Sequence, residues 1–436
     1  MDKMLEMLFE PQRWQKAIER GLEKDIRKEQ LISLTKPRVR QMLYNMIKDG
    51  KYRVSPPHAA EIPKEKKGEF RTVYANEPVD RVLLNIINDI FFELCPEMVH
   101  PACRSYLKGE GSGKTVMEVS RMVRNVKREG CIGFKADLSK YFDSVPLRFI
   151  DGVFDAVEKK VGESQVINLV RDYYHSDLYF DCQGEIKSDY KSLKQGCAVS
   201  AFLADVLLYE TDKVMSGLGG YYVRYCDDIL YIGENYEDAY LTLKKMLEGL
   251  ELTLNSAKVE NLYKDIENLY KDIEYLYKDK FFKFLGFTIK GETISLSRSR
   301  IKKFEKEILD RTIRKRGISP KSAAKSVKNY LYSLEGKHSW ATQVLPVCNS
   351  DSDLITMNSF VMDCIRAVMT GKKRVGTLYY IPQGEENGCV GRSKGRNVKA
   401  NREKTGSLEH LYLSLRCMRN ALLTNRVLYN RLLKEF

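Results

Sequence analysis

The chain has 436 residues, of which 43% are hydrophobic and 10% aromatic, and its formal net charge at pH 7 is +14. This length exceeds a single compact core, so we expect two or three subdomains. A charge this positive favours a polyanionic partner, with a nucleic acid as the first candidate, and a generally cationic surface without a specific partner is the alternative.

The cysteines and the apolar segments exclude several other classes. The ten cysteines include no C-x-x-C pair and no Cys/His cluster with zinc-ligand spacing. The N-terminus lacks a basic region followed by a long apolar core, and no apolar run approaches the ~20 residues that span a bilayer. We therefore expect a cytoplasmic protein with no membrane partner, whose cysteines are small core residues.

The first 60 residues are predicted to form a helical extension. Pro37 suits the first turn of a helix, Thr35 is the candidate cap upstream of it, and Gly50 ends the segment. Basic residues recur throughout this region: Arg13, Arg20, Arg27, Lys28, Lys36, Arg38 and Arg40.

Residues 61–74 predict a tight basic hairpin of two short strands around Gly68. Lys64 and Arg71 flank its turn and suit an anionic ligand. An exposed edge hairpin that is protected by lysines is the alternative.

A strong helix is predicted from residue 77 to 94, with Pro78 in its first turn. The glycine-rich stretch that follows is not a phosphate-binding P-loop, because only three residues separate Gly109 from Gly113 where that loop needs four. We expect a simple glycine-rich loop before a helix at 116–126.

Residues 131–145 form the next informative stretch. Alternating apolar residues predict a strand whose polar face ends in Asp137. Helical segments then continue to about His175, and two strands are expected at Leu178–Cys182 and Glu185–Lys187. A loop at 193–200 leads into a single helix at Ala201–Met215, with Ser200 as its N-cap.

Two adjacent carboxylates, Asp227 and Asp228, lie between two apolar, aromatic runs that each read as a strand. Like charges this close repel and raise each other's pKa, and a divalent cation removes that repulsion. A solvated Asp-Asp turn is the alternative when the pair is considered alone.

The remaining chain is predicted to be mostly helical. Asn235 is expected to cap a helix over 236–250, followed by a strand and loop at 252–258 and a strand at 281–289. Between them, residues 260–280 repeat a heptad with an apolar seam, which predicts an inserted helix or hairpin, with a partner-binding helix as the minority alternative. Helices dominate from Arg298, residues 371–406 read as a basic loop, and a helical hairpin closes the chain.

The order of these features resembles reverse transcriptases over about residues 50–300. Six segments carry the resemblance: Ile62–Arg71 (fingers), Phe134–Asp143 (palm motif A), Gln195–Gly196 with the following helix (motif B), Tyr225–Asp228 (motif C), Leu254–Lys258 (motif D) and Phe284–Phe287 (primer grip). The resemblance implies an α+β right-hand polymerase fold, with fingers, a palm of antiparallel sheet with helices on one face, and a helical thumb.

The resemblance also implies roles for individual residues. Asp137, Asp227 and Asp228 would be the catalytic residues and would hold two Mg²⁺ ions, or Mn²⁺, with the Leu138 carbonyl assisting. The deoxynucleoside triphosphate would be bound by a wider set, with Phe142 as the steric gate under the sugar 2′-position: Lys64, Arg71, Leu138, Tyr141, Phe142, Gln195 and Lys258.

The implied domains are a helical extension (1–60), fingers (61–130), palm (131–297, with the heptad insertion 260–280), thumb (298–370) and a basic C-terminal region (371–436). Ala201 and Asp205 depart from the residues usual in the related group II intron and retron enzymes. No maturase, DNA-endonuclease, RNase H or integrase signature is visible in the residues after 300, so the chain resembles prokaryotic stand-alone enzymes of the defence-associated or abortive-infection type, which copy a dedicated non-coding RNA into DNA.

Two other functions remain open at this stage. The same palm site would also serve template-independent or protein-primed DNA synthesis. A non-catalytic RNA-binding scaffold is the third hypothesis, which the intact aspartates disfavour.

Overall fold

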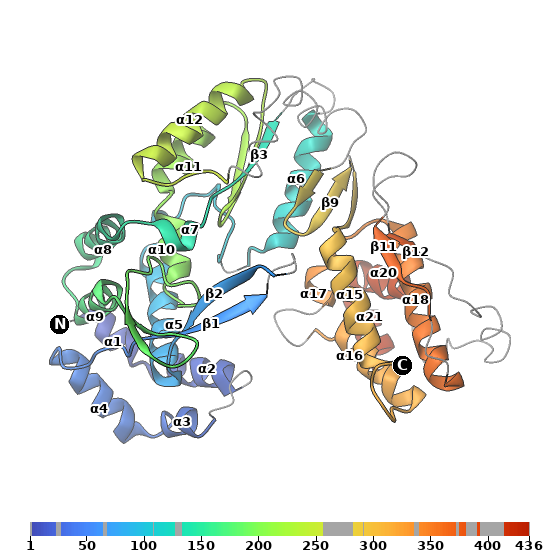
Figure 1. Cartoon of the computed structure of the whole chain (residues 1–436), viewed down its shortest axis with the longest axis horizontal. Coiled ribbons are helices and arrows are strands. Elements are labelled where there is room, and N and C mark those ends of the chain that lie inside the picture. The colour runs from blue at the N-terminus through green and yellow to red at the C-terminus, as the bar shows by residue number, and fades with distance from the viewer. Residues whose placement is uncertain are drawn as a thin grey trace. The chain divides into compact units, whose positions relative to one another are not determined.

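The computed structural model of the chain (Figure 1) describes residues 2–22, 28–63, 68–107, 109–126, 133–255, 282–290, 292–334, 340–371, 375–380, 390–392 and 414–435. The chain divides into two compact units. Unit 1 comprises Met1–Glu110 and Gly133–Asp265, and unit 2 comprises Gly111–Ile132 and Ile266–Phe436. The predicted heptad segment, 260–280, lies outside the described residues.

The N-terminal part of unit 1 is helical, as predicted. Helices α1 (Lys3–Leu8), α2 (Pro11–Leu22) and α3 (Lys28–Ser33) pack around α5 (Pro78–Leu94), while α4 (Pro37–Lys48) packs on α9 (Gln165–His175). Thr35 is not the cap that we predicted, because its hydroxyl donates to the Ile32 carbonyl at 2.7 Å and Lys36 takes the cap position. Pro37 does begin α4, where its missing N–H costs nothing.

The two strands of the predicted basic hairpin are present, and residues 64–67 of its turn lie outside the described residues. Strands β1 (His58–Pro63) and β2 (Phe70–Ala75) pair antiparallel, and β4 (Leu178–Phe180) and β5 (Ile186–Ser188) extend them into a sheet of order β2-β1-β4-β5. The last two strands are the pair expected before the glutamine–glycine loop, each within two residues of its predicted ends.

The second sheet of unit 1 is antiparallel, in the order β3-β7-β6, and it carries the aspartates. Its strands are β3 (Gly133–Asp137), β6 (Tyr221–Tyr225) and β7 (Asp228–Ile232), so Cys226 and Asp227 form the two-residue turn of the predicted hairpin. One face packs against helices, where Phe134 stacks on Tyr231 with ring centroids 5.6 Å apart and meets Tyr240 of α12 (Tyr236–Gly249) edge-on at 5.4 Å.

The segment that we predicted as one helix, 201–215, is two helices, α10 (Ser200–Val206) and α11 (Tyr209–Ser216). The carbonyls of Ala204 and Asp205 accept hydrogen bonds from the buried guanidinium of Arg224, and that of Ala204 also accepts one from the Tyr141 hydroxyl. These side chains satisfy the terminal carbonyls of α10, so the helix ends there.

Of two other predicted caps, that at Ser200 is wrong, and that at Asn235 takes the predicted N-cap position without a side-chain capping bond. Ser200 is the first residue of α10 rather than its cap, and its hydroxyl donates back to the Leu193 carbonyl. Asn235 makes no capping bond to α12, because its side chain instead accepts from the Tyr231 hydroxyl at 2.6 Å and donates to the Leu218 carbonyl at 2.7 Å. Both polar side chains make hydrogen bonds to groups outside their helices.

The other elements of unit 1 are short connectors and a helical pair. They are η1 (Pro96–Met98), α7 (Tyr141–Ser144) and α8 (Leu147–Val161), which packs on α9 and α10. These segments agree with the predicted helical stretch that ends at His175.

Unit 2 contains a small antiparallel sheet, β8 (Phe282–Phe284), β9 (Phe287–Lys290) and β10 (Thr293–Leu296). The predicted single strand 281–289 is therefore a hairpin, which turns at Leu285 and Gly286 with φ of +48° and +80°. Helix α6 (Ser112–Val126) packs on β9 and β10, although it lies between two segments of unit 1 in the sequence.

The rest of unit 2 is mainly helical, as predicted: α15 (Arg298–Arg311), α16 (Pro320–Tyr332), α17 (Trp340–Gln343), α18 (Asp351–Thr370), α20 (Leu415–Thr424) and α21 (Arg426–Glu435). Phe304 anchors its core, 4.7 Å from Trp340 and 6.4 Å from Phe360 between ring centroids. The region predicted as a basic loop contains one strand pair, β11 (Leu378–Tyr380) with β12 (Val390–Arg392).

Two general expectations concern the cysteines and the membrane-spanning potential of the helices. The eight cysteines of the described part of the chain are all free thiols and six of them are buried, as expected of small core residues. Among the helices that the structure describes, none combines the length and apolar character needed to cross a bilayer. The α+β fold class is confirmed.

The buried ion pair between Arg224 and Asp212 yields a prediction about stability. Both side chains have no exposed surface, so Asp212→Ala leaves a buried guanidinium uncompensated. We expect the free energy of unfolding to fall by about 3–5 kcal/mol, measured by chemical denaturation. Glu210→Ala is the matched control on the same helix, because the Glu210 side chain is 69% exposed. If both variants lose the same free energy of unfolding, the buried pair of Arg224 and Asp212 does not have the structural role that we assign to it.

Candidate active site

The predicted carboxylates meet at one end of the sheet β3-β7-β6. Asp137, the last residue of β3, lies directly opposite Asp228, the first residue of β7, in the antiparallel register. Directly opposed residues project from the same face of a sheet, so these two carboxylates share a face. Asp227 lies in the adjoining turn, and its carbonyl accepts a hydrogen bond from the Leu138 N–H at 3.1 Å. Asp137, Asp227 and Asp228 thus lie at the same end of the sheet in the backbone register.

Two polar contacts orient the carboxylates. The Asn255 side-chain amide donates to Asp137 Oδ2 at 3.2 Å, and its backbone N–H donates to the Asp137 carbonyl at 2.7 Å. Lys135 Nζ lies 2.9 Å from Asp228 Oδ1. Lys135 is two residues before Asp137 on the same face of β3, so its ammonium offsets part of the repulsion between the opposed carboxylates.

The donor chemistry of this site fits a divalent cation, because carboxylate and carbonyl oxygens are the hard ligands that Mg²⁺ prefers. Asp137 is 9% exposed, which keeps its carboxylate at the edge of the core. Within the described residues, no three His, Cys, Asp or Glu side chains are gathered closely enough to hold a metal. In this structure Asp228 is paired with Lys135 instead.

The turn that carries Asp227 has a strained backbone. Cys226 has φ of +59°, a left-handed conformation that residues with a side chain seldom adopt. Its N–H donates to Ser105 Oγ at 2.9 Å and its carbonyl accepts from Arg224 Nη1 at 3.2 Å. Strain of this kind persists only where neighbouring groups hold it, and it concentrates at functional sites.

Arg224 lies beneath this turn, on the helix-packed face of the sheet. Burial would lower the pKa of Arg224, but the Asp212 carboxylate more than offsets this and keeps the pKa well above its ordinary value. Asp212 also accepts from the Tyr222 hydroxyl at 2.8 Å, so one carboxylate holds two side chains of β6. For a carboxyl group burial acts in the opposite direction, and it raises the pKa of Asp205 to about 6.

Phe142 and Tyr141 follow Asp137 through a turn in which Lys140 has φ of +48°. Phe142 is half-buried, and its carbonyl accepts from the Leu193 N–H at 3.1 Å, which ties it to the loop that carries Gln195. Tyr141 is 2% exposed and its hydroxyl donates to the Ala204 carbonyl at 2.7 Å. The Tyr141 side chain is therefore turned into the core, away from a bound nucleotide.

The Gln195–Gly196 loop is fixed from two sides. The Tyr74 N–H of β2 donates to the Gln195 carbonyl at 2.7 Å, and a Cβ on Gly196 would lie 2.9 Å from the Tyr74 carbonyl oxygen. Gly196 has φ of +114°, so both the backbone conformation and the close approach require glycine. Gln195 itself is half-buried.

Lys194 holds the other side of this loop. Its ammonium is buried, donates to the carbonyls of Tyr173 and Ser176 at 2.5 and 2.7 Å, and lies 4.3 Å from the centre of the Tyr173 ring. These carbonyls belong to the C-terminal end of α9, where a cation is favoured. Burial lowers the pKa of Lys194 to about 8.

Four other residues were predicted to contact the nucleotide: Lys64, Arg71, Leu138 and Lys258. Arg71 is exposed on β2, where it lies opposite Ile62. Leu138 is 2% exposed, so only its backbone is offered to a ligand. Lys64 and Lys258 lie outside the described residues.

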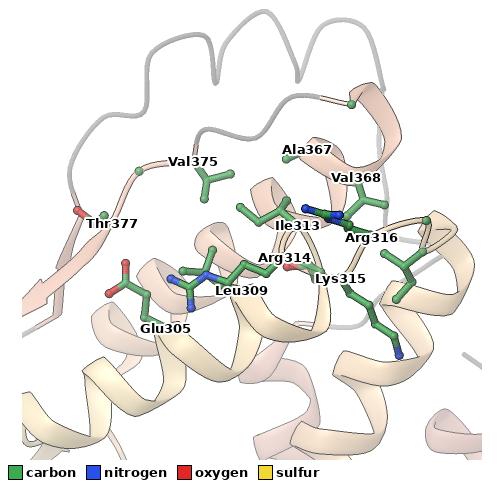
Figure 2. A pocket seen from close by; sticks show the side chains of 15 residues that line it. Glu305, Leu309, Ile313, Arg314, Lys315, Arg316, Ala367, Val368, Val375 and Thr377 are labelled. Carbon is green, nitrogen blue, oxygen red and sulfur yellow. The ribbon is translucent and has the colours of Figure 1, made fainter.

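Unit 2 contains a cavity of about 810 Å³ between α15, the end of α18 and the segment before β11 (Figure 2). Its walls include the apolar side chains of Leu309, Ile313 and Val368. Three consecutive basic residues line it as well: Arg314, Lys315 and Arg316. This surface is suited to an anionic partner.

Sequence reasoning missed the residues that support the site. Ser105, Lys194, Asp212 and Arg224 are fully or almost fully buried. Charged residues are rarely buried without a partner, but a sequence does not reveal which ones are inside. Only Arg224 carried a signal in the sequence. It is a charged residue in an apolar strand, one residue before Tyr225, and alternation along the strand turns its side chain to the face that packs against helices.

Comparison with known proteins identifies one family. The model of the family "Reverse transcriptase (RNA-dependent DNA polymerase)" matches residues 62–289, just over half of the 436 residues. No curated protein sequence matches the chain.

Two solved structures of apo telomerase from Candida tropicalis are similar to the chain. One has 12% identity and a TM-score of 0.40, and the match covers 73% of this chain and 58% of that one. The other, truncated from its C-terminal domain, has 13% identity and a TM-score of 0.38, and the match covers 58% of each chain. The chain thus spans well under two thirds of the telomerase chains.

The lowered pKa of Lys194 predicts a pH dependence. The folded state binds fewer protons than the unfolded state between pH 8 and the ordinary lysine pKa of 10.5, so this residue adds stability as pH rises through that window. We expect the unfolding free energy of the wild type minus that of Lys194→Met to increase by on the order of 1 kcal/mol from pH 7 to pH 9. Lys213→Met, at a side chain that is 62% exposed, should give a constant difference in the same denaturation series.

Proposed function

Because the chain belongs to the reverse transcriptase family of RNA-dependent DNA polymerases, with the right-hand polymerase fold of that family, we propose that its Asp137, Asp227 and Asp228 catalyse RNA-templated DNA synthesis. One observation carries this proposal. Asp137 and Asp228 are opposed in register on neighbouring strands, and Asp227 lies in the turn beside them. Like charges directly opposed on neighbouring strands repel each other, and a bound cation would remove that repulsion.

Reverse transcriptase domains use divalent metal ions, and we propose Mg²⁺, with Mn²⁺ as a substitute, held by the three aspartates and the Leu138 carbonyl. When bound, such ions activate the primer 3′-hydroxyl and stabilise the departing pyrophosphate. Lys135 would release Asp228 when the cations bind, since one carboxylate oxygen now lies 2.9 Å from its ammonium.

The chain's other residues would position the nucleotide. Phe142, tied through its carbonyl to the loop of Gln195, would lie under the sugar and exclude a 2′-hydroxyl. Arg71 and Lys64, on the β1-β2 hairpin, would bind the triphosphate, because guanidinium and ammonium groups bind phosphate oxygens strongly. Lys258 would protonate the pyrophosphate.

We also propose the domain roles implied by the family resemblance, with one difference. Residues 112–126 were assigned to the fingers, but α6 packs within unit 2. Unit 2 would supply the thumb, and the basic wall formed by Arg314, Lys315 and Arg316 would contact phosphates of the RNA template or the nascent DNA.

The template that we propose is a dedicated non-coding RNA, copied in a prokaryotic antiphage defence setting. The support is the net charge of +14 and the resemblance to stand-alone defence enzymes. Sequencing the nucleic acids that co-purify with the protein tests this part. Enrichment of one structured RNA supports it, and a random sample of cellular RNA contradicts it.

Removing one metal-binding carboxylate should abolish synthesis. With a primed RNA, deoxynucleotides and Mg²⁺, we expect Asp227→Asn to lower the extension rate at least about a hundredfold, because several kcal/mol of charge stabilisation is lost. Asp238→Asn, at an exposed position on α12, is the control and should extend normally. Extension by Asp227→Asn at the wild-type rate would refute the metal assignment.

The same assay separates the alternative reactions. Product formed without any added template would indicate template-independent synthesis. DNA that stays attached to the protein after denaturation would indicate a protein primer.

The steric gate predicts a change in sugar selection. Truncating Phe142 to alanine opens space at the 2′-position, so we expect the preference for deoxynucleotides over ribonucleotides to fall by about 10- to 100-fold, read from the ratio of kcat/KM values. Phe149→Ala, which removes a ring of equal size on α8, should leave this ratio unchanged. If Phe142→Ala prefers deoxynucleotides over ribonucleotides as strongly as the wild type does, Phe142 is not the steric gate.

A further inference from the structure

The aspartate turn needs a force that keeps it in its strained conformation. Cys226 has φ of +59°, a left-handed conformation that is unfavourable for a residue with a side chain. Its two neighbours in the chain are Tyr225, paired with Asp228, and Asp227. A relaxation of this residue would therefore move the Asp227 carboxylate and the start of β7 together.

The N–H of Cys226 is held from outside the hairpin. It donates to Ser105 Oγ at 2.9 Å, and the Ser105 hydroxyl in turn donates to Asp205 Oδ1 at 2.5 Å. Ser105 and Asp205 have no exposed surface. Because a serine has a single hydroxyl proton, the bond to Asp205 fixes that proton and turns an oxygen lone pair toward Cys226.

The segment that carries Ser105 is itself fixed to the sheet. The Arg104 N–H donates to the Arg224 carbonyl at 2.8 Å, and the Arg224 N–H donates to the Ala102 carbonyl at 2.9 Å. These bonds run along β6 on the side away from β7. Ser105 is therefore positioned by backbone pairing, and its hydroxyl is oriented by a carboxylate from α10.

We propose that Ser105, oriented by Asp205, is a positioning residue that holds Cys226 in the left-handed conformation and so sets Asp227 and Asp228 for catalysis. This inference rests on the proposed polymerase function. It gives a role to two residues that the motifs left without one, Asp205 and Cys226. It also explains why a residue with a side chain is tolerated at a position that favours glycine.

Ser105→Ala tests the inference against a control with the same bonding pattern. Ser164, at the first turn of α9, accepts from the Val166 N–H at 3.1 Å and donates to Asp2 Oδ1 at 2.8 Å. Each alanine variant loses one buried serine with the same two bonds, so we expect similar falls in melting temperature. Only Ser105→Ala should lower kcat, by about tenfold, and raise the Mn²⁺ concentration that half-maximally stabilises the protein in thermal melts.

A glycine at position 226 provides a second, independent readout. Glycine adopts the left-handed conformation without strain, so the turn then needs less support from Ser105. In a double-mutant cycle, we expect Ser105→Ala to lower kcat less than threefold in the Cys226→Gly background, against about tenfold in the wild-type background. Equal losses in both backgrounds would overturn the strain argument.

The role of Asp205 is separated by two substitutions. Asp205→Asn keeps an oxygen that accepts from Ser105 and should retain activity within about threefold, whereas Asp205→Ala should behave like Ser105→Ala. If Ser105→Ala extends primers as well as Ser164→Ala while the wild type is active, the inference is wrong. If the wild type fails to extend any primer, the polymerase proposal fails instead, and the Mn²⁺ melts still report whether Ser105 affects the turn.

Discussion

The guanidinium of Arg224 is the interaction on which the aspartate site depends. It has no exposed surface, and it joins three pieces of chain: α11 through the Asp212 carboxylate, α10 through two carbonyls, and the turn through the Cys226 carbonyl. A buried ion pair seldom adds stability compared with an apolar replacement, but its directional bonds specify one arrangement of the parts it touches. Here the parts are the helices and the turn that carries Asp227.

On the face of the sheet opposite Arg224, the site holds like charges close together. Asp137 and Asp228 oppose each other across a strand pair, and Lys135 offsets part of the repulsion. Like charges this close repel each other, and a bound cation would remove that repulsion. The hydrogen bonds of Arg224 fix the turn from one face of the sheet. The strained turn therefore cannot relax to separate the carboxylates, which repel each other on the other face.

Several features of the fold could be predicted from the sequence because they follow from local periodicity. The apolar alternation around Asp137 and the two runs around Asp227 predicted β3, β6 and β7, and the spacing after Pro78 predicted α5. Errors occurred where a distant side chain decided a local outcome. The helix predicted over 201–215 breaks because Arg224 and Tyr141 take its carbonyls.

The order of motifs along the chain determined by itself the family, the three aspartates and the basic hairpin, because those signals are residue types at short spacing. Only the tertiary structure decided which strand ends meet, that Tyr141 is turned into the core, and that Ser105 supports Cys226 from 121 residues away. The physical reason is that a hydrogen bond depends on positions in space. Ser105, Asp205 and Cys226 lie far apart in the sequence, and no local pattern records that folding brings them together.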